Sequence, residues 1–235
     1  MKKIFVALLS FAFVSVNAQT VDDVIQKYSI AMGSLEGFNK VTSAKMTGSV
    51  AIQGMDFPVT TQILNGKGMR TDVDVMGKTV TNTYGFGKAW KINPYDGAEI
   101  ATEVTGNDLL AFKTQASLAN NLMDYKNRGH KVELAGTETI EGVKTFKIKL
   151  TNKEDNKDSW YFITASDYML LKTVSKRTMA GEEVEVETFY SNFKEFSGIK
   201  FALMISQQAG GNVIQQISWS NIELNVPVDE NIFKM

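Results

Sequence analysis

Few residues of this chain have the types needed for catalysis or metal binding. It has one histidine, His130, and no cysteine, so it offers no thiol nucleophile, disulfide or multi-histidine metal site. Glu183, Glu185 and Glu187 alternate with valines and could present three carboxylates to calcium from one strand face. Such a comb is more often a solvated face that discourages edge pairing. We therefore expect no metal, no cofactor and no catalytic residue, with His130 at a turn or strand start.

Motifs for known chemistries are also missing from the sequence. It contains no G-x-S-x-G, no phosphate-binding P-loop and no dinucleotide-binding fingerprint. Its formal net charge of −1 lacks the basic excess of a nucleic-acid-binding protein. These observations predict a non-enzymatic protein that does not bind nucleic acid.

The first eighteen residues have the pattern of a signal peptide. Two lysines precede an apolar run that ends at Val16, and Ala18 closes a small-residue cleavage site. The run is shorter than the about 20 residues that span a bilayer. No cysteine follows that could carry a lipid anchor. We expect cleavage of residues 1–18 after Ala18, which leaves residues 19–235 as a single periplasmic domain that does not span the membrane.

The spacing of apolar residues predicts a helical start followed by many strands. Thr20 can cap a helix that ends at Gly33, and a short second helix is expected over residues 35–40. From Ala44 onward the apolar period is two, with turn sequences at roughly 8–12-residue intervals. One later helix, capped by Asn107 or Asp108, is expected from the apolar stripe Leu109, Phe112, Ala116, Ala119 and Met123.

About twelve or thirteen strands and two or three helices make the fold class mainly β, or α+β. Open twisted sheets rarely exceed about ten strands, so this antiparallel sheet must curve strongly into an incomplete β-barrel. Residues 199–205 carry apolar side chains on both strand faces, although an antiparallel sheet normally has one wet face. We therefore expect the helices to form a lid over a concave apolar cavity.

Several segments follow one another in the order of a known family. Residues 87–95 read GKAWKINPY, which resembles a G-K-x-W-x-x-N-P-[FY] turn. Residues 122–150 resemble the middle segment of the same proteins, and residues 190–207 and 222–235 resemble their closing strands and C-terminal extension. The chain thus resembles the periplasmic lipoprotein-carrier superfamily of the LolA/LolB type, in particular its outer membrane lipoprotein-sorting branch.

This resemblance implies a carrier that shields acyl chains of lipoproteins, or another lipid, between the inner and outer membranes. The implied partners are the inner- and outer-membrane components of lipoprotein sorting. Carriers of this type often have an Arg-Pro pair before the third strand, whose arginine is linked to lid movement. Asn65 and Gly66 stand at that place in this chain, and Arg70 is the nearest arginine and the candidate lid or rim residue.

The residues expected to bind the acyl chain come from three segments. They are Trp90, Ile92, Leu109, Phe112, Phe201 and Leu203. Trp90 and Ile92 would give one apolar row of the concave surface, and Leu109 and Phe112 would lie over its mouth. We place Phe201 and Leu203 inward because Lys200, on the opposite strand face, would be costly to bury.

Two other functions stay open at this point. A non-transporting envelope scaffold or sensor of the same fold would have its cavity plugged by its own helices. A carboxylate-based hydrolase would need a cleft with two carboxylates of perturbed pKa, and the sequence marks none. Lipid that copurifies with the native protein would favour the carrier over both.

Overall fold

The computed structural model describes residues 19–179 and 181–234, so the signal peptide expected over residues 1–18 lies outside the described residues. The helices are α1 Val21–Met32, α2 Leu35–Lys40, α3 Gly106–Gln115 and α4 Tyr125–Arg128, with 3₁₀ turns η1 Pro94–Asp96 and η2 Glu230–Phe233. The strands are β1 Ser43–Ile52, β2 Met55–Leu64, β3 Gly68–Val75, β4 Lys78–Gly85, β5 Lys88–Asn93, β6 Ala98–Val104, β7 Lys131–Ile140, β8 Val143–Thr151, β9 Asp158–Thr164, β10 Leu170–Met179, β11 Glu182–Phe196, β12 Ile199–Ala209 and β13 Asn212–Leu224.

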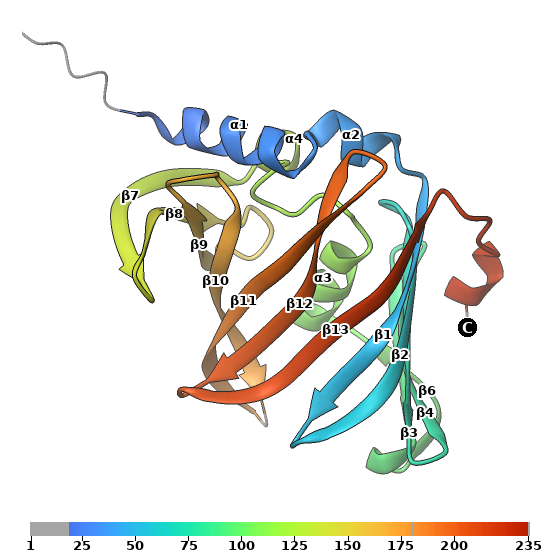
Figure 1. Cartoon of the computed structure of the whole chain (residues 1–235). Helices are drawn as coiled ribbons and strands as arrows, with labels where there is room; N and C mark the ends of the chain where they lie inside the picture. Colours follow the sequence, from blue (N-terminus) through green and yellow to red (C-terminus); the bar gives the residue numbers. More distant parts are fainter. Residues whose placement is uncertain (1–18, 180, 235) are drawn as a thin grey trace, which may run out of the picture.

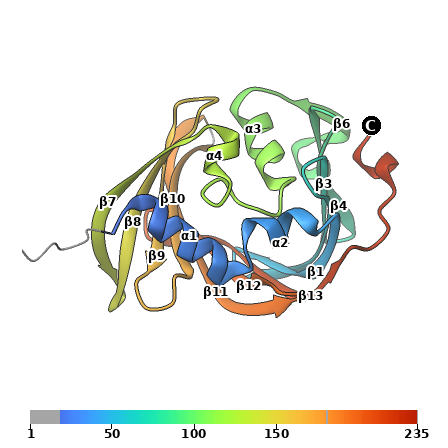
Figure 2. The ribbon, with the colours of Figure 1, turned by 90° about the horizontal axis from the view of Figure 1, so that it is seen from above.

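All of these strands belong to one antiparallel sheet in the order β6-β5-β4-β3-β2-β1-β13-β12-β11-β10-β9-β8-β7. Each neighbouring pair is consecutive in the sequence except β1 and β13, which join two meanders at a single seam. The sheet curves into an incomplete barrel, with α1 and α2 across one end (Figure 1). Seen from above, α3 and α4 lie between the edge strands β6 and β7 (Figure 2). The predicted mainly-β incomplete barrel is confirmed, with four α-helices in the described residues rather than two or three.

The N-terminal helices form as their sequence predicts. The Thr20 hydroxyl accepts a hydrogen bond from the Asp23 amide, and the Asp23 carboxylate accepts one from the Thr20 amide, both at 3.1 Å. Gly33 ends α1 with φ 110°, and a Cβ at this position would collide with the backbone of Gly198 and Ile199. Only glycine therefore lets the end of α1 approach the turn between β11 and β12 so closely.

The predicted long helix after residue 107 is wrong in its start and its length. Its N-cap is Thr105, and α3 ends at Gln115 instead of continuing through Met123. Residues of the β2–β3 turn bind the backbone groups that would otherwise form hydrogen bonds within a longer helix. The Gly66 amide donates to the carbonyl of Ala116 at 2.8 Å, and the Leu118 amide donates to Asn65 Oδ1 at 3.0 Å. Met123 is still buried, but in the loop that leads to α4.

Two buried clusters attach the helices to the inner face of the sheet. In the first, α1, α2 and the loop before α4 pack against β8, β9 and β12 through residues that include Tyr28, Phe38, Leu122, Ile148, Tyr161, Ile163 and Ile199. In the second, α3 packs against a cross-strand row made of Ala44, Ile63, Met69, Tyr84, Ala89 and Val104. The inner face is therefore filled by helices at the lid end of the barrel.

The seam between β1 and β13 contains a β-bulge. Thr47 pairs with Asn221 and Gly48 pairs with Trp219, which leaves Ser220 as an extra residue in β13. The Ser220 hydroxyl donates to the carbonyl of Thr47 at 3.0 Å. Gly48 lies so close to β13 that a Cβ would overlap the carbonyl oxygen of Ser218.

The C-terminal extension folds back onto the outer face of β3 and β4. Phe233 of η2 is fully buried there. Its side chain covers Gly68 and Gly85, which pair with each other across the two strands. A Cβ at Gly68 would lie 2.7 Å from the Phe233 ring, so these glycines leave room for the aromatic side chain.

Candidate ligand-binding surface

The part of the inner face that the helices do not fill is an apolar band in the middle of the barrel wall. Tyr190, Ile205, Ile217, Val50 and Phe57 pair across β11, β12, β13, β1 and β2. We call these five residues the interior row. Val50 is buried, whereas the other four are partly exposed. Since antiparallel pairing keeps paired side chains on one face, the row forms continuous apolar wall across the seam.

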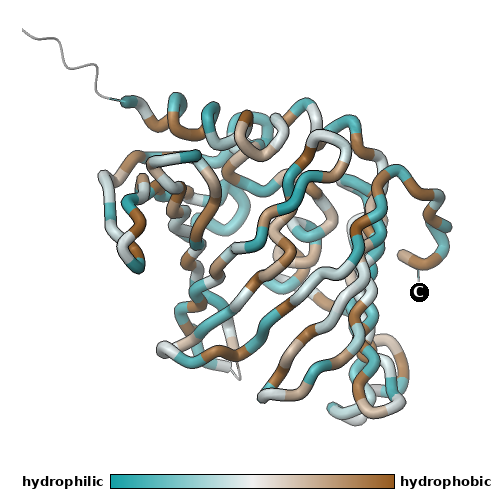
Figure 3. Tube along the Cα trace, viewed as in Figure 1, coloured by the Kyte–Doolittle hydropathy of each residue, from teal (hydrophilic) through white to brown (hydrophobic). Residues whose placement is uncertain are grey.

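The band has a boundary on each side. Toward the lid, Leu203 and Trp219 are also partly exposed, and Phe201 beyond them packs edge-on against Phe38 of α2 with ring centroids 5.9 Å apart. Away from the lid, the next pair of side chains on the inner face is polar, since Gln207 pairs with Gln215. Hydrophobic and hydrophilic segments alternate along these strands (Figure 3). The accessible apolar surface therefore consists of the interior row together with Leu203 and Trp219.

The residues expected to bind a ligand fall into two groups. Phe201 and Leu203 alternate with Met204 and share the inner face with Ile205, while Leu109 and Phe112 pack on the inner face of β4 and β5. Trp90 and Ile92 alternate with the buried inner residue Ala89, so they lie on the outer face. The structure therefore does not bring these two residues together with the others.

Arg70 lies on the outer face as well. It shares a cross-strand row with Thr83 and Trp90. Its Nε donates to the Asp72 carboxylate at 2.8 Å, and its Nη1 reaches the carbonyl of Ile232 in the C-terminal extension at 3.5 Å. In this conformation Arg70 contacts the C-terminal extension and not the lid.

Asn65, in the turn that replaces the expected Arg-Pro pair, connects both parts of the lid to the sheet. Its Nδ2 donates to the carbonyls of Phe38 at 2.9 Å and Val41 at 2.8 Å, at the end of α2. Its Oδ1 accepts from the Leu118 amide in the loop after α3. The sequence shows an Asn-Gly turn here but not these three contacts, which depend on residues distant in the chain.

A second set of contacts holds α1 to the loop and helix opposite it. Asp22 accepts hydrogen bonds from the Tyr125 hydroxyl and from Lys126 Nζ, and these bonds hold the pKa of Asp22 below its ordinary value. The Tyr28 hydroxyl accepts from Asn120 Nδ2 at 2.7 Å, and burial raises the pKa of Tyr28. These polar contacts add to the buried apolar cluster that α1 forms with the sheet, so both must be released if the lid moves.

We predict that Asn65→Ala loosens the lid. The change removes three hydrogen bonds whose partners are partly buried, which should lower the free energy of unfolding by about 2 kcal/mol. Urea unfolding measures the loss, and amide hydrogen exchange should show faster exchange at Leu118. Asn107→Ala is the control, since exposed Asn107 should change stability by less than about 0.5 kcal/mol. Equal stability of the two variants would contradict the role of Asn65.

His130 lies directly before β7, as expected for a strand-start residue. Its Nδ1 accepts a hydrogen bond from the Lys153 amide at 3.2 Å, and burial together with the nearby Arg128 lowers the pKa of His130. The surrounding polar pocket of about 340 Å³ includes Lys113 and Glu154, which pair with each other at 2.6 Å. Lys113 and Glu154 satisfy each other, whereas the buried Nε2 of His130 has no hydrogen-bond partner among the described residues.

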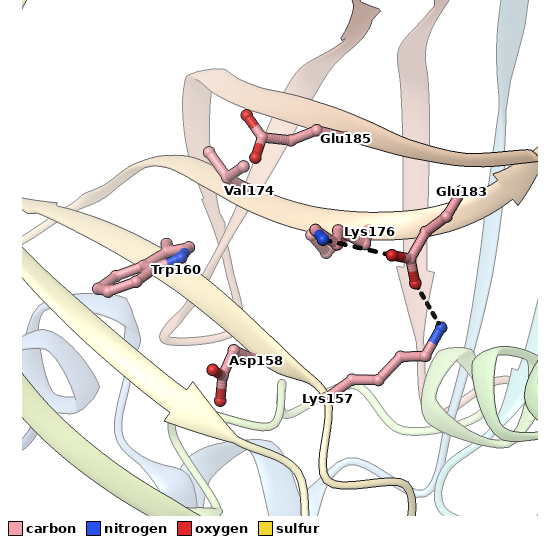
Figure 4. Close-up of a pocket in the computed structure, with 8 residues that line it drawn as sticks. Lys157, Asp158, Trp160, Val174, Lys176, Glu183 and Glu185 are labelled. Carbon is pink, nitrogen blue, oxygen red and sulfur yellow. Dashed lines mark hydrogen bonds and ion pairs between the residues drawn. The ribbon is translucent and has the colours of Figure 1, made fainter.

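The three glutamates considered for calcium lie on the outer face of β11. Figure 4 shows the pocket beside them, of about 340 Å³, with Trp160 at one side. Glu183 forms ion pairs with Lys157 at 3.2 Å and Lys176 at 3.3 Å, and Glu187 pairs with Lys172 at 2.7 Å. Within residues 19–179 and 181–234, no group of three acidic, histidine or cysteine side chains is placed to hold a metal ion. Lysines therefore pair with two of the three carboxylates that calcium would need, Glu183 and Glu187.

The titration of the carboxyl groups gives no support to a hydrolase. Among the described residues, the carboxyl groups with a shifted pKa are Asp22, Asp23, Glu36, Asp158, Asp167 and Glu183. Each of these pKa values is lowered, mainly by side-chain hydrogen bonds, whereas a general acid needs a raised value.

Comparison with known proteins identifies the fold. No family model and no curated protein matches the sequence. A LolA superfamily protein from Nitrosomonas europaea matches with a TM-score of 0.61 at 13% identity, over 93% of this chain and 99% of its own. An outer membrane lipoprotein-sorting protein domain from Vibrio parahaemolyticus gives 0.61 at 12% identity, over 92% and 96% of the two chains. A DUF1329 family protein from Desulfovibrio piger gives 0.60 at 13% identity, over 92% and 98%.

These three matches define the class of fold. The chain has the curved-sheet fold of LolA superfamily and outer membrane lipoprotein-sorting proteins, which confirms the resemblance at the level of fold. In the described part of the chain, no helix has the length and apolar character needed to cross a membrane.

Proposed function

We propose that this protein is a carrier that holds acyl chains of a lipid or lipoprotein against the apolar band inside the barrel, for transfer toward the outer membrane. The observation that supports the proposal is the partly exposed apolar wall formed by the interior row with Leu203 and Trp219. The proposed location is the periplasm, after removal of residues 1–18. An interaction with inner- and outer-membrane sorting components belongs to the same proposal.

The energy of acyl-chain burial sets a condition on how such a carrier works. Half of a sixteen-carbon chain would gain ~6 kcal/mol and a whole chain about twice that, before the cost of association. A micromolar dissociation constant corresponds to about 8 kcal/mol, so most of the chain must be buried. Because α1, α2 and α3 fill the inner face at the lid end, tight binding requires the lid to move outward.

One observation favours a second candidate, an envelope scaffold or sensor. Tyr28, Phe38 and Leu122 plug the lid end of the barrel with the protein's own side chains. If the lid stays closed, the exposed band is short and suits contact with a protein segment rather than a whole acyl chain.

A matched pair of substitutions separates these candidates. Leu203 lies on the inner face, and its neighbour Met204 lies on the outer face with 37% of its surface exposed. We predict that Leu203→Glu weakens binding of a fluorescent fatty acid at least about tenfold, because a carboxylate in an apolar wall must be desolvated. Met204→Glu should bind within about twofold of the parent, since its charge stays in water.

Circular dichroism must show that both variants fold. If both fold and both bind the fatty acid as the parent does, the acyl chain does not use this band and the carrier proposal fails. No fatty-acid binding by the parent itself would favour the scaffold.

A further inference from the structure

The end of the barrel opposite α1 and α2 carries exposed apolar side chains at each of five hairpin turns. These turns connect β1–β2, β3–β4, β5–β6, β10–β11 and β12–β13 (Figure 1). The side chains are Met55, Met76, Tyr95, Met179 and Val213, joined by Ile100 on β6, and 38–80% of their surface is exposed. We call these six residues the apolar rim. Scattered exposed apolar residues are ordinary, but one at each of these five turns is a pattern. The β8–β9 turn, which the strand order places at the same end of the sheet, carries only polar side chains.

Met76 stands at the tip of the β3–β4 hairpin with 71% of its surface exposed. Met76 has φ 45° and Gly77 has φ 85°, so both central residues of this two-residue turn have a left-handed conformation. Asparagine, aspartate and glycine suit such turns, whereas a methionine is disfavoured. The same left-handed pair occurs at Gln53–Gly54 and Phe86–Gly87, so the exposure of Met76 at this end, and not its turn conformation, carries the argument. The neighbouring turn is tied to this one, since the Tyr95 hydroxyl donates to the carbonyl of Val75 at 2.5 Å.

The arrangement fits a lipid surface better than a protein partner. The rim residues stand on separate turns with polar residues between them, whereas a protein interface has a continuous, closely packed core. A fluid membrane interface can take up separate apolar side chains, and tyrosine is typical of that region. We propose that the apolar rim docks the protein onto the surface of a zwitterionic lipid bilayer.

The charged residues near the apolar rim favour a zwitterionic bilayer over an anionic one. Within three residues of a rim residue along the chain, six side chains are acidic and three are basic. The acidic ones are Asp56, Asp74, Asp96, Glu99, Glu103 and Glu182, and the basic ones are Lys78, Lys176 and Arg177. An acidic excess repels anionic lipid surfaces, which attract basic clusters instead. Docking must therefore depend on the apolar side chains.

This proposal goes beyond the carrier function and does not depend on it. Vesicle binding and fatty-acid binding are separate measurements on the same protein, so either can fail while the other succeeds.

The test is flotation of the purified protein with phosphatidylcholine vesicles. Met76→Asn should reduce the bound fraction, and the combined variant Met55→Asn, Met76→Asn and Val213→Asn should weaken the partition constant at least about tenfold. Phe86→Asn is the matched control. Phe86 is also exposed, has φ 54° and precedes a glycine, but it lies in the β4–β5 turn, where Lys234 Nζ is 5.2 Å from its ring.

Asparagine suits the left-handed turn positions of Met76 and Phe86, so these two single variants should fold at least as stably as the parent. Met55 and Val213 are strand residues, so circular dichroism must show that the combined variant folds. The expected result is vesicle binding that the rim variants lose and Phe86→Asn retains. No vesicle binding by the parent, or equal binding by all variants, overturns the proposal. Rim-dependent self-association without vesicle binding would also overturn it, because the occupant would then be a second copy of this chain.

Discussion

Gly48→Ala is expected to abolish stable folding at the seam between the two meanders. The added Cβ would overlap the carbonyl oxygen of Ser218 and lie 2.9 Å from the Cα of Trp219. Both contacts are with backbone, so a change of side-chain rotamer cannot relieve them, and β1 must separate from β13. We expect a loss of more than about 3 kcal/mol in the free energy of unfolding, measured by urea unfolding.

Gly37→Ala is the control for Gly48→Ala. A Cβ at Gly37 in α2 would meet only ordinary contacts, the nearest at 3.4 Å, so alanine should be neutral or stabilising by about 0.5–1 kcal/mol. If the two alanine variants unfold at the same urea concentration as the parent, the close approach at the seam is not a constraint on the fold.

Phe233→Ala is expected to detach the C-terminal extension and to destabilise β3 and β4. The side chain is fully buried over Gly68 and Gly85, and neither glycine can fill the space that alanine would leave. Large-to-small changes of a buried phenylalanine cost about 3–5 kcal/mol. We expect the lower end of that range, because the extension can separate without unfolding the whole sheet.

Urea unfolding and limited proteolysis of the C-terminus measure this effect. Lys234→Ala changes the exposed neighbour of Phe233 and should cost less than about 0.5 kcal/mol. A Phe233→Ala protein as stable as the Lys234→Ala protein would show that the extension contributes nothing to the sheet.

Elements with a strong local pattern were predictable from the sequence. The capping box at Thr20, the glycine stop at Gly33 and the bounds of α2 follow from neighbouring residues. The strands follow from alternation, since a half-buried strand needs one apolar face. The end of α3 was not predictable in this way, because Asn65 and Gly66 bind the groups that would have continued the helix.

The face on which Trp90 lies could have been inferred with one more step. The two-residue turn at Phe86 and Gly87 fixes the hairpin register, which pairs Trp90 with Thr83 and then with Arg70 across β3. That polar row indicates an outer face. Alternation within one strand shows only that Trp90 and Ile92 share a face, not which face it is.

Four members of the apolar band were missed for a different reason. Val50, Phe57, Ile217 and Trp219 each look like ordinary strand residues, and none stands out in its own segment. They meet only because β1 pairs with β13, a contact between the two ends of the domain. No local pattern in either strand predicts that pairing.

The same pairing has a consequence for the order in which the protein folds. Every other strand pair can form as a hairpin as soon as its two strands are available, and local pairings of this kind are fast. The β1–β13 pair can form only once β13, the last strand of the chain, is available. Until β13 pairs with β1, Val50 in the first strand lacks its partner Ile217. We expect both meanders to form early and the closure of β1 on β13 to be the slow step. During that delay β1 adds an unpaired edge to those of β6 and β7, and it is open to association with another chain.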